Sequence, residues 1–199
     1  MKKLIGFFLI TIVLTACDNN PVPKPTGYFR IDLPEKNYSR VDTIPFPFSL
    51  KLPQYAFVNL RRTKKEKNFL NIDFTRFGAR VHMSYIPIND NLPKLLEDSR
   101  TLVYKHVVKA QDIKENLVMN REDRVFGTYY QIEGNAASGS QFYLTDSVNH
   151  FLRGALYFNV EPNYDSIAPV QAFIKKDIEE LIEGFKWKEE DSKLKATNK

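Results

Sequence analysis

The residues best suited to chemistry in this 199-residue chain are a carboxylate and an imidazole that an expected hairpin brings together. Residues 69–86 alternate apolar and polar side chains on either side of a glycine, which predicts two antiparallel strands joined by a turn. An even loop keeps the apolar side chains on one face, opposes Phe74 with Val81 and puts Asp73 opposite His82. A carboxylate beside an imidazole can orient it for proton transfer or metal binding.

Other signs of catalysis are few. The sequence contains no Gly-rich phosphate loop, no Gly-x-Ser-x-Gly and no His-Glu-x-x-His. The remaining histidines, His106 and His150, are not at ligand spacing from His82 or from each other, so a zinc site is not indicated. No serine or cysteine nucleophile is evident beside Asp73 and His82, so an enzyme built on them is the least favoured hypothesis. A cross-strand polar pair is the simpler interpretation, and we expect no catalytic residue, no metal and no cofactor.

The N-terminus predicts export and lipidation. Lys2 and Lys3 precede a short apolar run and small residues, which is typical of a secretory signal peptide at residues 1–16. The run is too short for a comfortable membrane span. Cys17, the only cysteine of the chain, directly follows Leu-Thr-Ala and resembles the acylated cysteine of a bacterial lipobox. We therefore expect palmitate on Cys17 and attachment of an otherwise soluble module to a membrane through lipid.

The rest of the chain divides into three parts. Residues 17–27 carry the lipidated cysteine and three alternating prolines, which favour an extended, semi-stiff tether. Residues 28–187 suit one domain, and residues 188–199 read as a charged, disordered tail. No acidic run follows Cys17, which favours the periplasmic side of the cell envelope over the cell surface.

The pattern of apolar residues predicts an α+β fold. A helix is expected from Leu92, and a second helix opens at Pro169. Besides the hairpin, the expected strands are 29–33, 46–52, 125–133, 141–146 and 151–160. Short turns join most neighbouring strands, so the sheet should be mostly antiparallel with two packed helices. This order of elements is similar to the PsbP-like fold.

Three blocks resemble the GldD family of gliding-motility lipoproteins. They are Lys-Pro-Thr-Gly-Tyr-Phe-Arg-Ile-Asp-Leu-Pro at 24–34, Leu-Asn-Ile-Asp-Phe at 70–74, and Leu-Leu-Glu-Asp-Ser-Arg-Thr-Leu-Val-Tyr-Lys-His at 95–106. The resemblance extends over nearly the whole mature chain. It implies a part in the surface-gliding machinery of Bacteroidota, which is tied to type IX protein secretion, and it brings no catalytic residue with it.

The leading hypothesis is a structural or assembly lipoprotein that binds other envelope proteins of gliding motility and type IX secretion. Candidate contact residues are Arg30, Asp32, Asp73, His82, Asp98 and Arg100. Nucleic acid is not expected as a partner, because export is predicted and the formal charge of +5 falls to a mild +3 once Lys2 and Lys3 are removed with the signal peptide. The alternative is a periplasmic lipid- or small-molecule-binding module, which requires an apolar pocket between helix and sheet.

Overall fold

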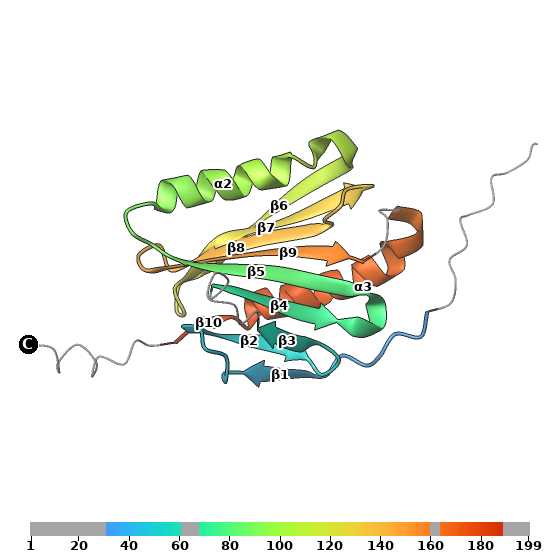
Figure 1. The fold of residues 1–199 in the computed structure, drawn as a ribbon, viewed down its shortest axis with the longest axis horizontal. Coiled ribbons are helices and arrows are strands. Elements are labelled where there is room, and N and C mark those ends of the chain that lie inside the picture. Colours follow the sequence, from blue (N-terminus) through green and yellow to red (C-terminus); the bar gives the residue numbers. More distant parts are fainter. Residues whose placement is uncertain (1–30, 61–67, 160–163, 189–199) are drawn as a thin grey trace, which may run out of the picture. The chain divides into compact units, whose positions relative to one another are not determined.

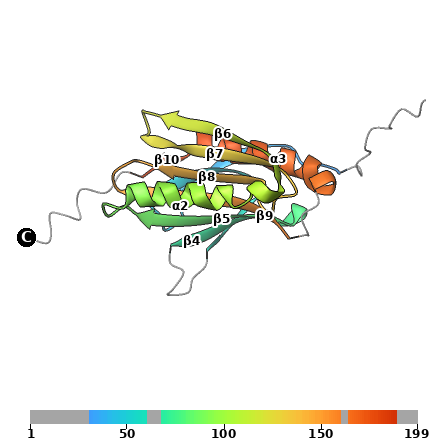
Figure 2. The same cartoon turned by 90° about the horizontal axis from the view of Figure 1, so that it is seen from above.

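A seven-stranded antiparallel sheet runs through the described part of the protein, and the two α-helices of this part lie on opposite faces of the sheet (Figure 1, Figure 2). The structure is a computed structural model that describes residues 31–60, 68–159 and 164–188. Several sequence predictions lie outside these residues, namely the signal peptide 1–16, Cys17, the tether 17–27, Arg30 and the tail from residue 189.

The strands of the large sheet follow in space in the order β3 (Phe57–Leu60), β4 (Phe69–Phe74), β5 (Ala79–Pro87), β9 (His150–Phe158), β8 (Ser140–Thr145), β7 (Val125–Gly134) and β6 (Ala110–Asn120). A small antiparallel sheet consists of β1 (Tyr38–Val41), β2 (Phe48–Pro53) and β10 (Lys186–Trp187). The helices are α2 (Leu92–Tyr104) and α3 (Tyr164–Glu183), and two 3-10 turns are η1 (Thr75–Phe77) and η2 (Val107–Lys109). The predicted α+β class with a mostly antiparallel sheet is confirmed.

The two faces of the large sheet bury different cores because side chains alternate along each strand. On one face, Ile174 and Ile178 of α3 belong to the larger core, together with Phe48 of the small sheet. On the other face, Val103 of α2 packs with Tyr130 of β7 in a smaller cluster. Figure 2 shows that α2 runs along the middle strands of the sheet and does not cover β4. Part of this second face is therefore open.

The β4–β5 hairpin has the predicted apolar face and an even loop, but its register differs from the prediction by two residues. Phe74 pairs with Ala79, so the loop has four residues where the prediction has six. The 3-10 turn η1 tightens the loop, and Gly78 closes it in the left-handed conformation at φ 56°. The predicted pairing of Asp73 with His82 is therefore wrong.

Four strands were not predicted from the sequence, because each is either very short or mostly exposed and therefore has no clear pattern of apolar residues. β1, β3 and β10 have four residues or fewer, and β6 is an edge strand whose residues are mostly exposed. Conversely, the expected strand 29–33 is absent over its described part, because residues 31–37 have no regular structure. Ile31 and Leu33 are 37% and 43% exposed, so their alternation does not reflect burial.

The last helix begins at Tyr164, five residues before the predicted start at Pro169. Pro169 therefore lies inside the helix and not at its first turn, so the N–H that would donate to the carbonyl four residues earlier is missing there. The predicted apolar stripe is confirmed where the helix meets the larger core. Its buried members are Ile174, Ile178, Leu181, Ile182 and, just after the helix, Phe185.

A single buried carboxylate joins α3 to the segments around the small sheet. The Asp177 side chain is fully buried and accepts hydrogen bonds from the hydroxyls of Tyr38 and Tyr55, each at 2.8 Å. Lys36 forms an ion pair with the same carboxylate at 2.5 Å and donates a second hydrogen bond to the carbonyl of Phe173. Burial, and then the hydrogen bond to Asp177, raises the pKa of both tyrosines. The cluster is thus a satisfied, partly buried polar network around one fully buried carboxylate.

We expect Asp177→Asn to lower the free energy of unfolding by about 2 kcal/mol, because the partly buried Lys36 ammonium loses its counter-ion and the two tyrosine hydroxyls lose a charged acceptor. Urea denaturation followed by circular dichroism measures the change. Asp98→Asn, on the exposed side of α2, is the matched control and should change stability by less than about 0.5 kcal/mol. Equal stability of the two variants would contradict the structural role of the cluster.

Candidate functional site

The structure brings together two of the predicted contact residues and separates the others. Asp73 on β4 and His82 on β5 line the same hollow on the open part of the sheet face. Asp98 and Arg100 are exposed on α2, and Asp32 lies in the exposed segment before β1. The five described residues therefore do not form one surface.

The Asp73 carboxylate is bound by its neighbours on the sheet. Arg80, its partner in the β4–β5 register, donates to both carboxylate oxygens, and Asn59 of β3 donates at 3.0 Å. Burial tends to raise the pKa of Asp73, but the hydrogen bonds from Arg80 and Asn59 outweigh it, so this pKa is lowered. The charge of His82 adds only a smaller effect in the same direction. Asp73 is thus an ion-pair partner of Arg80.

The His82 ring is oriented by an amide. Its Nδ1 lies 2.8 Å from Oδ1 of Asn71, so Nδ1 carries the proton and donates it to the amide oxygen. The ring also meets the edge of Tyr157, with centroids 5.6 Å apart. The carboxylate–imidazole dyad that the sequence suggested is replaced by two separate pairs, Asp73 with Arg80 and His82 with Asn71.

His82 and Tyr157 separate two neighbouring hollows on this face. The Asp73 hollow has a volume of about 340 Å³ and contains the Asp73–Arg80 pair. The second hollow, of about 300 Å³, is called the Arg153 hollow here. It is lined mainly by Phe69, Asn71, His82, Ser84, Arg153 and Tyr157. Both are small enough to suit a small molecule.

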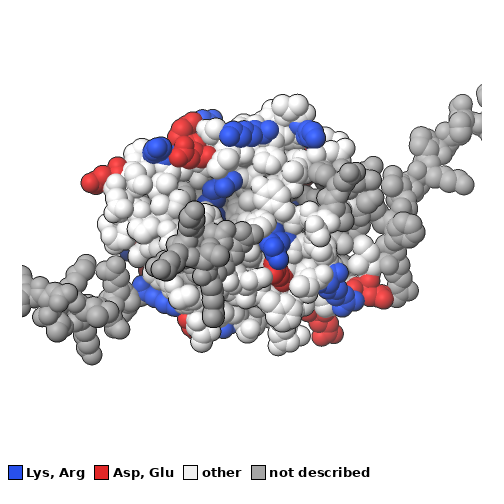
Figure 3. Space-filling view, in the orientation of Figure 1, with Lys and Arg blue, Asp and Glu red and all other residues white. Residues whose placement is uncertain are grey.

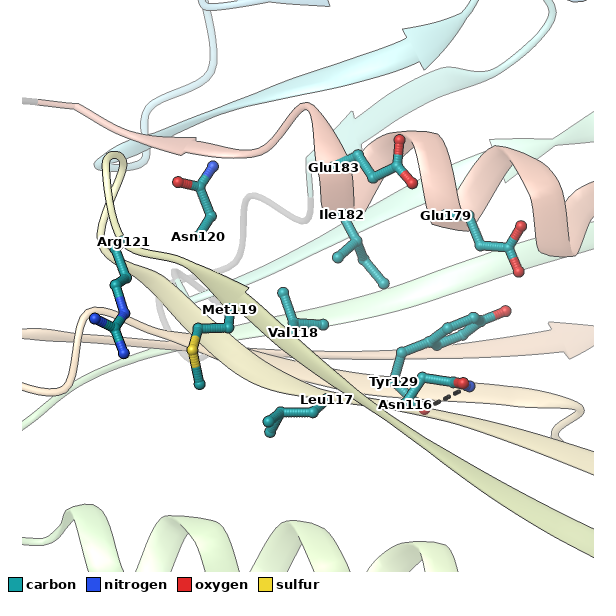
Figure 4. A pocket seen from close by; sticks show the side chains of 10 residues that line it. All are labelled: Asn116, Leu117, Val118, Met119, Asn120, Arg121, Tyr129, Glu179, Ile182 and Glu183. Carbon is teal, nitrogen blue, oxygen red and sulfur yellow. Dashed lines mark hydrogen bonds between the residues drawn. The ribbon is translucent and has the colours of Figure 1, made fainter.

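A larger groove of about 670 Å³ lies between the edge strand β6 and α3 (Figure 4). We call it the β6–α3 groove. Val118 of β6 and Ile182 of α3 project into it, and the buried Tyr129 lies at its base. Two carboxylates of α3, Glu179 and Glu183, complete the lining together with polar side chains of β6. The groove is thus apolar at its centre and acidic on the helix side.

The β6 strand beside this groove is exposed. β7 is its only neighbour in the sheet, so the backbone groups of its outer edge have no strand partner among the described residues. Leu117 and Met119 are 73% and 57% exposed and also border the groove, but their side chains project from the strand away from Val118 (Figure 4). An exposed edge strand with apolar side chains is a surface that can accept another strand.

Charges do not gather into one patch on the face drawn in Figure 3. Lys and Arg side chains are interspersed there with Asp and Glu. Within the described ranges, no group of three or more His, Cys, Asp or Glu residues is placed to hold a metal ion. Nor does any helix in this part of the chain have the length and apolar character needed to cross a membrane.

Sequence reasoning missed Arg80, Arg153 and the groove residues on β6 and α3. Arg153 has a signal that could have found it, because it is the only charged residue within the otherwise apolar run Phe151–Phe158. The run Leu117-Val118-Met119 is a similar signal, since three apolar residues follow polar ones without alternation. The partner of Asp73 could not be read from the sequence without the length of the turn.

Comparison with known proteins identifies the chain over most of its length. The family model described as gliding motility lipoprotein GldD matches residues 18–187. The match begins directly after Cys17 and ends with β10. No curated protein matches the chain.

We expect Arg80→Gln to raise the pKa of Asp73, because burial remains while the hydrogen bonds from the guanidinium are lost. Carboxyl chemical shifts followed by NMR over a pH titration measure it. In the wild type the folded pKa lies below the unfolded value of about 3.9, so the pairing stabilises the protein above about pH 4. That stabilisation is lost as the pH falls through the folded pKa.

Arg100→Gln, on α2, is the matched control and should leave the titration of Asp73 unchanged. The opposite pattern would contradict the assignment. In that case the pKa of Asp73 would be unchanged from wild type in Arg80→Gln and would shift markedly only in His82→Ala.

Proposed function

The chain belongs to the GldD family of gliding motility lipoproteins, and on that premise we propose that it is a structural or assembly component of the gliding machinery and of the associated type IX secretion. Family membership implies involvement in gliding motility and membrane anchoring in the cell envelope. The observation that carries the proposal is the match over residues 18–187, which starts at the residue after the predicted acylated cysteine.

The proposed anchor is lipid on Cys17, with the domain facing the periplasm. The lipobox-like Leu-Thr-Ala-Cys sequence and the lipoprotein family both support acylation there. Two or more acyl chains hold a protein on a bilayer firmly, whereas a single chain binds reversibly. The prolines of residues 17–27 favour an extended tether, at about 3.1 Å per residue in the polyproline II conformation.

We further propose that the domain acts by binding other envelope proteins and not by catalysis. Asp73 is occupied by Arg80 and Asn59, and His82 is oriented by Asn71, so neither side chain resembles a poised acid or base. The surface best suited to a protein partner is the outer edge of β6 with Leu117 and Met119. An extended segment of a partner can pair with the β6 backbone and bury these two side chains.

A periplasmic ligand-binding module remains the second candidate function. The β6–α3 groove favours it, because about 670 Å³ lies within the usual range of small-molecule sites. Glu179 and Glu183 outnumber Arg121, the one basic residue of the lining, so the groove is better suited to neutral or cationic molecules than to anionic lipids. Binding of a neutral lipid by the purified protein, lost in Ile182→Glu, is the observation that would favour this candidate.

Deletion of the gene should abolish spreading on surfaces and reduce type IX secretion, and Cys17→Ala should fail to restore either. The thiol is the proposed acylation site, so the alanine variant lacks its anchor. Colony spreading, assays of secreted protein and mass spectrometry of the mature N-terminus measure the outcome. Asn19→Ala is the control and should restore both activities. Full rescue by Cys17→Ala, at normal protein level, would contradict the proposed role of the anchor.

The double substitution Leu117→Glu with Met119→Glu should reduce recovery of cross-linked motility or secretion proteins at least about tenfold. Two carboxylates would have to be buried against the partner, and about 1.4 kcal/mol already gives this factor. Quantitative mass spectrometry after cross-linking and affinity purification measures the recovery.

Val148→Glu is the matched control, because Val148 is 54% exposed in the turn between β8 and β9. It should recover the same proteins as wild type. Unchanged recovery with the double variant, at unchanged thermal stability, would exclude the β6 edge as the binding surface.

A further inference from the structure

Arg153 is a cation held in the middle of the sheet. It lies on β9 between Leu152, which is fully buried, and Gly154, and its side chain lies on the face that carries α2. Its Nη2 donates to Oε1 of Gln141 on β8 at 2.8 Å. Gln141 is itself 1% exposed and contacts His106 near the end of α2. The guanidinium is therefore positioned by a buried side chain.

The Arg153 guanidinium has no carboxylate partner among the described residues. Its one hydrogen bond goes to a neutral amide, and no Asp or Glu lines the Arg153 hollow. Asp73, in the neighbouring hollow, is engaged by Arg80. Burial lowers the pKa of Arg153, and only the Tyr157 phenol acts in the opposite direction. Partly buried charges in proteins are usually paired with an opposite charge, so the Arg153 guanidinium is suited to bind an anion from outside the described residues.

The surroundings of Arg153 fit an anion with an apolar body. Ser84 lies directly opposite Arg153 in the β5–β9 register and offers a hydroxyl to the same hollow. Phe69, 45% exposed, and Tyr157 add aromatic surface around it. An arginine has five N–H donors in a planar fork that matches the oxygens of carboxylate and phosphate groups. A volume of about 300 Å³ limits the ligand to a small molecule.

We propose that the Arg153 hollow binds the oxyanion group, carboxylate or phosphate, of a small molecule with an aromatic or apolar body. Arg153 makes a bidentate contact with the oxyanion, Ser84 donates a hydrogen bond, and the body packs on Phe69 and Tyr157. This inference goes beyond the proposed function, because it depends neither on the lipid anchor nor on the protein partner at β6.

The test is an NMR titration of the purified protein with phenyl phosphate, benzoate and benzyl alcohol. At least one of the two anions should cause saturable shifts of backbone amides in β5 and β9 around the hollow. Benzyl alcohol lacks the negative charge and should cause none. The relative affinities of phenyl phosphate and benzoate then show whether the natural ligand is a phosphate or a carboxylate.

Substitutions locate the contact. Arg153→Gln should weaken binding at least about tenfold, and Arg153→Lys should give an intermediate loss because it keeps the charge without the fork. Arg100→Gln, which removes the same charge from exposed α2, should bind like wild type. Since Arg153→Gln can also disturb folding, Ser84→Phe provides a second variant, which fills the half-buried hollow and leaves Arg153 in place.

The proposal is overturned if neither anion shifts the amides around the hollow, or if benzyl alcohol shifts them equally. It is also overturned if Ser84→Phe, with the dispersed spectrum of a folded protein, binds the anions as tightly as wild type. None of these outcomes bears on gliding or secretion, so the proposed function stands or fails separately.

Discussion

The arrangement of this domain depends on the Asp177 carboxylate. Three donors from the segments before β1, in β1 and before β3 converge on it, so one side chain of α3 ties these segments to the helix. The Lys51–Glu180 ion pair adds a second link between β2 and α3. Glu179, Ile182 and Glu183 follow within six residues on the same helix and line the β6–α3 groove. The shape of that groove is therefore tied to a buried polar cluster on another side of α3.

The two faces of the large sheet pack against different cores, and single strands show how neighbouring residues contribute to each face. On β9, Leu152 and Leu156 are fully buried in the larger core, while Arg153 and Tyr157 line the open hollow on the other side. On β7, Tyr129 and Tyr130 belong to opposite cores. Because α2 covers only the middle strands, the same alternation that builds two cores also leaves polar side chains accessible beside β4 (Figure 2).

Sequence patterns predicted the elements that bury one face correctly. They did not predict features that depend on the length of a turn or on the position of a strand in the sheet. The apolar faces of the β4–β5 hairpin and of α3 could be predicted, because each buries every second residue or a helical stripe. The 3-10 turn before Gly78 could not be predicted from the sequence. Because this turn shortens the loop by two residues relative to the prediction, Asp73 pairs with Arg80 and not with His82. β6 escaped prediction because an edge strand exposed on both sides has no periodic burial to reveal it.

Membrane anchoring gives the β6 edge a further consequence. Molecules confined to the surface of one bilayer meet far more often than in solution, which raises their effective concentration. At such a high effective concentration, an unprotected edge strand would pair with the same strand of another copy and cause aggregation. The first half of β6 contains three charged residues, Asp112, Lys114 and Glu115. If two copies of β6 paired antiparallel, these charged residues would lie opposite the apolar half of the second copy, which is unfavourable. The strand thus discourages self-assembly while its apolar half stays available.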